Sequence, residues 1–64
     1  MEITQTIYED DFIVNFETKI GWFKAIRERS AWMFYFGQQF LGKFTDSDKC
    51  RKYVENLKIS VDFI

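Results

Sequence analysis

The stretch Trp32-Met33-Phe34-Tyr35-Phe36 is apolar throughout and constrains the fold more than any other part of the chain. Successive side chains of a β-strand point to opposite faces of the sheet, so Trp32, Phe34 and Phe36 would face one way and Met33 and Tyr35 the other. A chain of 64 residues usually covers only one face of a small sheet. The second face is therefore covered either by something the chain does not supply or by an unusually complete wrapping of the sheet.

The flanking residues predict neighbouring strands in an antiparallel meander. Residues 37–38 suit a two-residue type II′ hairpin turn with glycine first, and residues 39–44 would return as the partner strand. On the other side, residues 28–31 form a polar turn, and residues 20–28 are a third candidate strand. The core face of this third strand stays open, because basic and apolar residues are mixed on both of its faces.

The N-terminal residues carry a weaker strand pattern. Residues 3–8 alternate weakly, residues 9–11 are an acidic break, and residues 12–17 alternate well between apolar and polar side chains. Two interpretations remain open: the two segments form two strands, or they form one strand preceded by an extended arm.

The predicted helix covers residues 46–57. Thr45 suits the N-cap position, with the acidic Asp48 three residues later as in a capping box. Helical spacing places four less polar side chains in one continuous stripe, namely Cys50, Tyr53, Val54 and Leu57. After the helix, residues 59–64 alternate again, as a final strand or a docked tail would.

These patterns predict an α+β fold in one domain over residues 1–64. The sheet would be small and antiparallel, with about four strands, a three-stranded meander plus an N-terminal strand. One amphipathic helix would pack on one of its faces.

Composition limits how such a short chain can be stabilised. With a single cysteine and no histidine, the chain can form neither an intrachain disulfide nor a Cys/His zinc site. Aromatic residues make up 20% of the sequence and supply the bulk that a core needs. We expect no cofactor and no metal. With no apolar run long enough for a membrane span and no signal-peptide pattern, we expect a cytoplasmic protein without a membrane partner.

The charges are distributed unevenly along the chain. Residues 1–17 carry five acidic residues and no basic one, whereas residues 18–64 carry all nine lysines and arginines against five acids. This asymmetry results either from chance with internal pairing or from two surfaces of opposite sign, one of which steers a partner.

Catalysis has little support in the residue types present. Without histidine, the chain lacks the commonest general base, and neither Ser30 nor Ser47 has a partner of that kind to activate it. Cys50 lies on the apolar stripe of the helix, as an inert buried thiol would. The acids at residues 9–11 are better explained by a solvated loop than by a cation site. We therefore expect a protein that is not an enzyme.

Nucleic-acid binding is one candidate function. Lys24, Arg27 and Arg29 cluster around the first turn of the predicted meander. They lie next to three aromatic residues, Trp22, Trp32 and Tyr35. Basic residues interleaved with aromatic ones can hold phosphates and stack bases. The same residues could instead be ordinary surface charge at a hairpin tip, and the net charge of −1 weighs against nucleic-acid binding.

A family resemblance bears on the same segment. The stretch from Trp22 to Arg27, the sequence Leu41-Gly42-Lys43-Phe44 and a capped helix with Tyr53 resemble the plant AP2 DNA-binding domain and the arm-binding domains of phage integrases. The resemblance covers residues 21–57. It implies a three-stranded meander plus a helix, with DNA read by the exposed sheet face. The central strand here lacks the arginines that such a strand would offer DNA, so the resemblance favours the fold more than the function.

Binding to a protein partner is the function that we expect. The chain has more large apolar side chains than one short helix can cover, so some should remain on the second face with Met33 and Tyr35. Trp22, Met33 and Tyr35 would anchor the partner, because such residues are enriched at interface centres. Lys24, Arg27 and Arg29, or the acidic N-terminal segment, would orient it.

The partner would be modulated sterically. In size and composition the chain is similar to phage-encoded proteins that inhibit host machinery, anti-CRISPR proteins among them. A further alternative is a self-assembling subunit, such as a homodimer, whose second face is covered by its own copy.

Overall fold

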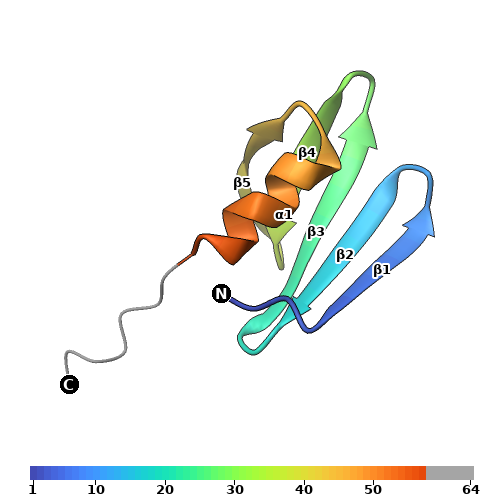
Figure 1. The fold of residues 1–64 in the computed structure, drawn as a ribbon. Helices are drawn as coiled ribbons and strands as arrows, with labels where there is room; N and C mark the ends of the chain where they lie inside the picture. Colours follow the sequence, from blue (N-terminus) through green and yellow to red (C-terminus); the bar gives the residue numbers. More distant parts are fainter. Residues whose placement is uncertain (58–64) are drawn as a thin grey trace.

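The computed structural model describes residues 1–57 and shows a five-stranded antiparallel sheet with one helix (Figure 1). Each strand pairs with its neighbours in the chain, in the order β1-β2-β3-β4-β5. The strands are β1 (Gln5–Asp10), β2 (Ile13–Thr18), β3 (Gly21–Glu28), β4 (Ala31–Phe36) and β5 (Gln39–Phe44), and the helix is α1 (Ser47–Glu55). The prediction of an α+β fold with a small antiparallel sheet and one helix is confirmed. The predicted strand or tail over residues 59–64 lies outside the described residues.

The number of strands corrects the predicted count of about four. The N-terminal residues form two strands, β1 and β2, and both belong to the sheet. A tight turn joins them, in which the Asp10 carboxylate accepts a hydrogen bond from the backbone N–H of Phe12 at 2.7 Å. The strand β1 is an edge strand with mostly exposed side chains, so little burial imposes an alternating pattern on its sequence. The sequence therefore could not decide whether these residues form a strand of their own or an extended arm.

The β4–β5 turn is formed as the sequence predicts. The turn consists of residues 37 and 38, and Gly37 has a φ of 60°. Gln38 is not among the residues with positive φ in the described part of the chain, so the turn has the glycine-first pattern of type II′. Within residues 1–57, the one non-glycine residue with positive φ is Arg29, at 61° in the β3–β4 turn.

The helix α1 begins one residue later than the predicted N-cap implies. Asp46, rather than Thr45, is the N-cap residue: its backbone is extended, and its carboxylate accepts a hydrogen bond from the backbone N–H of Lys49 at 2.9 Å. Of the predicted stripe, Cys50 and Val54 are fully buried. At the other end of α1, the α-amino group of Met1 donates hydrogen bonds of 2.8 Å to backbone carbonyls, which would otherwise lack helical partners.

The cap assignment makes a direct prediction about stability. We expect Asp46→Ala to lower the free energy of unfolding by about 1 kcal/mol, because an N–H at the start of α1 loses its acceptor. The matched Thr45→Ala change should cost much less. Urea unfolding followed by tryptophan fluorescence measures both, and a larger loss in the Thr45 variant would contradict the assignment.

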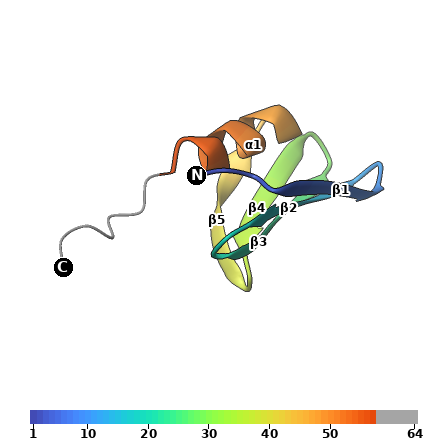
Figure 2. The same cartoon turned by 60° about the horizontal axis from the view of Figure 1, so that its bottom comes forward.

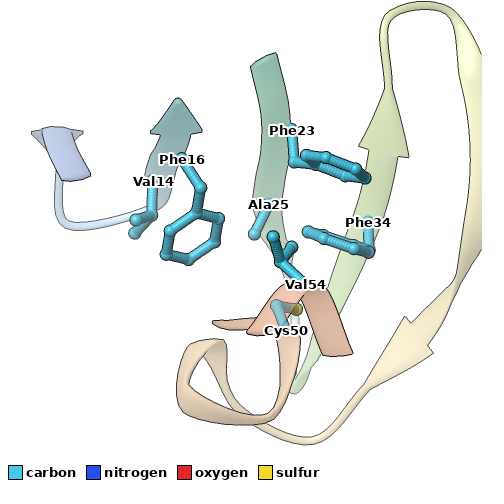
Figure 3. Close-up of a cluster of buried hydrophobic side chains, with 7 residues drawn as sticks. All are labelled: Val14, Phe16, Phe23, Ala25, Phe34, Cys50 and Val54. Atoms are coloured by element: carbon cyan, nitrogen blue, oxygen red, sulfur yellow. The ribbon is translucent and has the colours of Figure 1, made fainter. Parts of the chain in front are cut away.

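The core lies between one face of the sheet and α1. Its buried apolar residues are Val14, Phe16, Phe23, Ala25, Phe34, Cys50 and Val54 (Figure 3). The ring of Phe34 lies at the centre, stacked at 5.6 Å on Phe23 and in edge contact with Phe44 and Tyr53 at 5.6 and 5.5 Å. Trp32 and Phe36 pack against the same cluster, as the alternation of β4 predicts.

Candidate interaction surface on the open sheet face

The face of the sheet opposite α1 has no element of residues 1–57 over it (Figure 2). We call it the open face. Alternation along each strand and the register between strands define its side chains. They are Gln5, Ile7, Glu9, Ile13, Asn15, Glu17, Trp22, Lys24, Ile26, Glu28, Ala31, Met33, Tyr35, Phe40 and Lys43.

Cross-strand pairing arranges the apolar side chains of the open face in rows. One row runs from Ile13 through Ile26 to Met33 on neighbouring strands. In the next row, Tyr35 is paired with Phe40, and their ring centroids are 5.5 Å apart. The apolar surface is therefore continuous across at least four strands of the sheet.

Several of these side chains remain accessible to solvent. Phe40 is 50% exposed, Trp22 42% and Ile7 38%. Scattered apolar residues are normal on protein surfaces, but a contiguous group of large ones usually marks an interface. Trp, Tyr and Met are also the residue types that are enriched at interface centres.

The structure brings together four of the six residues that the sequence nominated for partner binding. Trp22, Lys24, Met33 and Tyr35 all lie on the open face. Arg27 is three positions after Lys24 on β3 and therefore points to the opposite face, opposite Trp32. Arg29 lies in the β3–β4 turn, where its carbonyl oxygen accepts a hydrogen bond from Nε of Arg27 at 3.2 Å.

The open face also contains residues that sequence reasoning did not nominate. Ile7 and Phe40 lie on the two edge strands, and the weak pattern of those strands gave no reason to select them. Asn15 and Glu9 are polar, and the β1–β2 register, which pairs Ile7 with Asn15, brings them into hydrogen-bonding contact. A signal was present only for Asn15, as a polar residue in the middle of an apolar strand.

Charge is sparse on the open face. Lys24 and Lys43 are its basic residues, and Glu9, Glu17 and Glu28 its acidic ones. Within residues 1–57, the ion pairs are those of Asp48 with Arg51 and Lys52, both on the exposed surface of α1. The lysines of the open face are therefore separate from that ion-pair network.

A small hollow lies at the β1–β2–β3 side of the open face. It has a volume of about 280 Å³ and is lined by Ile7, Glu9, Asn15 and Trp22. Asn15 is only 8% exposed, although α1 does not cover this face, and its Nδ2 donates a hydrogen bond to Oε2 of Glu9 at 2.6 Å. The hollow thus combines a buried carboxamide and a carboxylate with two apolar walls.

Cys50 lacks the properties of a nucleophile at neutral pH. Burial against the sheet, together with the nearby Asp46 carboxylate, raises the pKa of its thiol to about 12. A reactive thiol needs an accessible, electropositive environment that lowers the pKa instead. Within residues 1–57, no three or more His, Cys, Asp or Glu side chains are grouped so that they could hold a metal ion.

The raised pKa predicts a loss of stability at high pH. The thiol of the unfolded chain ionises near its ordinary pKa of 9, whereas the folded thiol stays protonated up to about pH 12. The unfolded state therefore gains stability as the pH rises through this window, and the free energy of unfolding falls. We expect the urea midpoint to fall more between about pH 8 and about pH 11 in the wild type than in Cys50→Ala. Parallel pH profiles would contradict this expectation.

The described helix α1 has nine residues, and no helix within residues 1–57 is long and apolar enough to span a membrane. Comparisons with protein-family models, curated proteins and solved structures give no significant match to this chain.

Proposed function

We propose that the protein is a non-catalytic binding module that recognises a protein partner through the open face and modulates that partner by steric occlusion. The proposal rests on the observation that only one face of the sheet is covered by a helix. The helix α1 packs on one face, whereas the other presents Trp22, Phe40 and Ile7 to solvent.

The balance of apolar and charged groups favours a protein over a nucleic acid as the partner. Nucleic-acid affinity comes largely from lysines and arginines that contact phosphates. The open face offers Lys24 and Lys43, while Arg27 lies on the opposite face and Arg29 in a turn. The two lysines are offset by Glu9, Glu17 and Glu28 on the same face. DNA or RNA binding through the sheet, as in the AP2-like domains, is thus the second candidate function.

Affinity capture from a lysate of the host tests the proposal. Tagged wild-type protein would be compared with Phe40→Ser, which places a polar group on the open face, and with Phe12→Ser. Phe12 is a matched control because it is 53% exposed but lies in the β1–β2 turn. We expect a defined protein to be captured, with or without nuclease, by the wild type and Phe12→Ser but much less by Phe40→Ser.

Three outcomes would contradict the proposal. Captured material that consists of nucleic acid, or that is lost after nuclease treatment, would favour the DNA or RNA alternative. Equal capture by both phenylalanine variants would place the partner elsewhere on the surface. Light scattering of the wild type and of Phe40→Ser tests the self-assembly alternative, because a stable dimer that the Phe40 variant disrupts would mean that a second copy covers the open face.

A further inference from the structure

The buried Asn15 is the most unusual polar group of the open face. Asparagine is depleted in strands, and a polar side chain on a sheet face without a helix over it is usually solvated. Asn15 is instead 8% exposed and lies between Ile7 on β1 and Lys24 on β3. A carboxamide has two donor hydrogens and two acceptor lone pairs. Within residues 1–57, its side chain makes one hydrogen bond, from Nδ2 to Glu9.

The groups around Asn15 share a preference for a cationic donor. The Glu9 carboxylate is in contact with it, and Glu17 lies two positions further along the same face of β2. The indole of Trp22 lines the hollow and is paired with Glu17 across the β2–β3 ladder. Carboxylates form charge-assisted hydrogen bonds with ammonium and guanidinium groups, and indole is the strongest aromatic partner for a cation.

Within residues 1–57, no lysine or arginine forms an ion pair with the carboxylate of this site. Lys24 is the cross-strand neighbour of Asn15, but it forms no ion pair with Glu9 or Glu17 within the described residues 1–57. The hollow is therefore bounded by the Glu9 carboxylate, the Asn15 carboxamide, the side chain of Trp22 and the aliphatic side chain of Ile7. The Glu17 carboxylate lies outside this lining and accepts a hydrogen bond from Thr4 at 3.1 Å.

We infer that the hollow lined by Ile7, Glu9, Asn15 and Trp22 is a specificity pocket that receives an arginine side chain of the protein partner. The guanidinium would donate to the Glu9 carboxylate and to Oδ1 of Asn15 while stacking on the indole of Trp22. The methylene stem would lie against Ile7. Arginine fits better than lysine because its planar fork can donate to two acceptors while stacking. This inference rests on the proposed function, since it names what the open face selects in its partner.

The probe is a pair of blocked tripeptides, acetyl-Gly-Arg-Gly-amide and the same peptide with citrulline in place of arginine. Citrulline keeps the shape and most of the donors of arginine but has no charge. Binding would be followed by the ¹H–¹⁵N signals of the Asn15 side-chain amide and the Trp22 indole. We expect saturable shifts of these signals in the millimolar range with the arginine peptide, and at least about tenfold weaker binding of the citrulline peptide.

The variant Glu9→Gln isolates the charge of the pocket. The amide oxygen of glutamine can still accept the hydrogen bond from Asn15, so the β1–β2 irregularity keeps its support while the negative charge is lost. We expect the arginine peptide to bind at least about tenfold more weakly to this variant. Glu55→Gln, on the exposed surface of α1, makes the same charge change away from the pocket and should bind like the wild type.

Each of three results would overturn the inference. They are equal binding of the two peptides, unchanged binding to Glu9→Gln, and no saturable shift at roughly 20 mM peptide. In any of these cases the Asn15–Glu9 hydrogen bond only supports the irregular β1–β2 pairing. The proposed function fails separately, when Phe40→Ser and Phe12→Ser capture the protein partner equally well.

Discussion

Replacing Phe34 with alanine is expected to leave most of the protein unfolded at 25 °C. Phe34 is fully buried, and its ring contacts the rings of Phe16, Phe23, Phe44 and Tyr53. Truncating a buried phenylalanine costs about 3–5 kcal/mol, because the burial of the ring is lost and the cavity only partly collapses. A domain of this length has a total stability of only about 3–10 kcal/mol.

Urea unfolding followed by near-ultraviolet circular dichroism measures this loss. Phe12→Ala is the matched control, because Phe12 is half exposed in the β1–β2 turn and its truncation should change stability by no more than about 0.5 kcal/mol. If Phe34→Ala unfolded at nearly the same urea concentration as the control, the core would not be centred on Phe34.

The second large effect is expected on partner binding. Tyr35 is half-buried on the open face, in contact with Phe40 and opposite Lys24 on β3. If it is an anchor of the interface, Tyr35→Ala should weaken the binding of the captured partner by about 2 kcal/mol, or roughly 30-fold. Titration calorimetry with the purified partner measures the change in dissociation constant.

Tyr8→Ala is the control for this measurement. Tyr8 is 70% exposed and lies on β1, but it points to the side of the sheet that α1 covers. Its truncation should leave the affinity within about twofold of the wild type. A larger loss with Tyr8→Ala than with Tyr35→Ala would move the interface to the groove between β1 and α1, where Tyr8 lies beside Ser47.

The local patterns that rest on strong burial could be predicted from the sequence. Both faces of the strand from Trp32 to Phe36 were assigned correctly, because Phe34 and its neighbours satisfy a strict alternation. The Cys50 and Val54 positions of the helix were equally clear. In both elements the side chains that pack in the core recur with one period, every second residue in the strand and every third or fourth in the helix.

The pairing between strands could not be predicted in the same way. The core face of β3 was ambiguous until the register placed Ala25 opposite Phe34. That register places Lys24 on the open face, and alternation along β3 puts Arg27, which had been expected to act with it, on the other face. The N-cap residue also differs from the prediction. Thr45 and Asp46 are both good N-cap residues, and the geometry of the β5–α1 connection determines which one has the extended backbone that a cap requires.

The pocket around Asn15 could not be predicted from the sequence either. Alternation along β1 places Glu9 on the same face as Ile7, and the register that pairs Ile7 with Asn15 brings the Glu9 carboxylate to 2.6 Å from the Asn15 amide. The sequence could not give this register, because the weak alternation of β1 did not establish that it pairs with β2.

The strictly sequential order of the strands has a consequence for how the chain is made. Each hairpin needs only its own residues to close, so the sheet can form progressively as the polypeptide leaves the ribosome, in the manner of folds dominated by local contacts. The helix comes last, and until Val54 has emerged the face that will become the core is as bare as the open one. A nascent sheet with two exposed apolar faces is prone to aggregation until α1 packs on the core face.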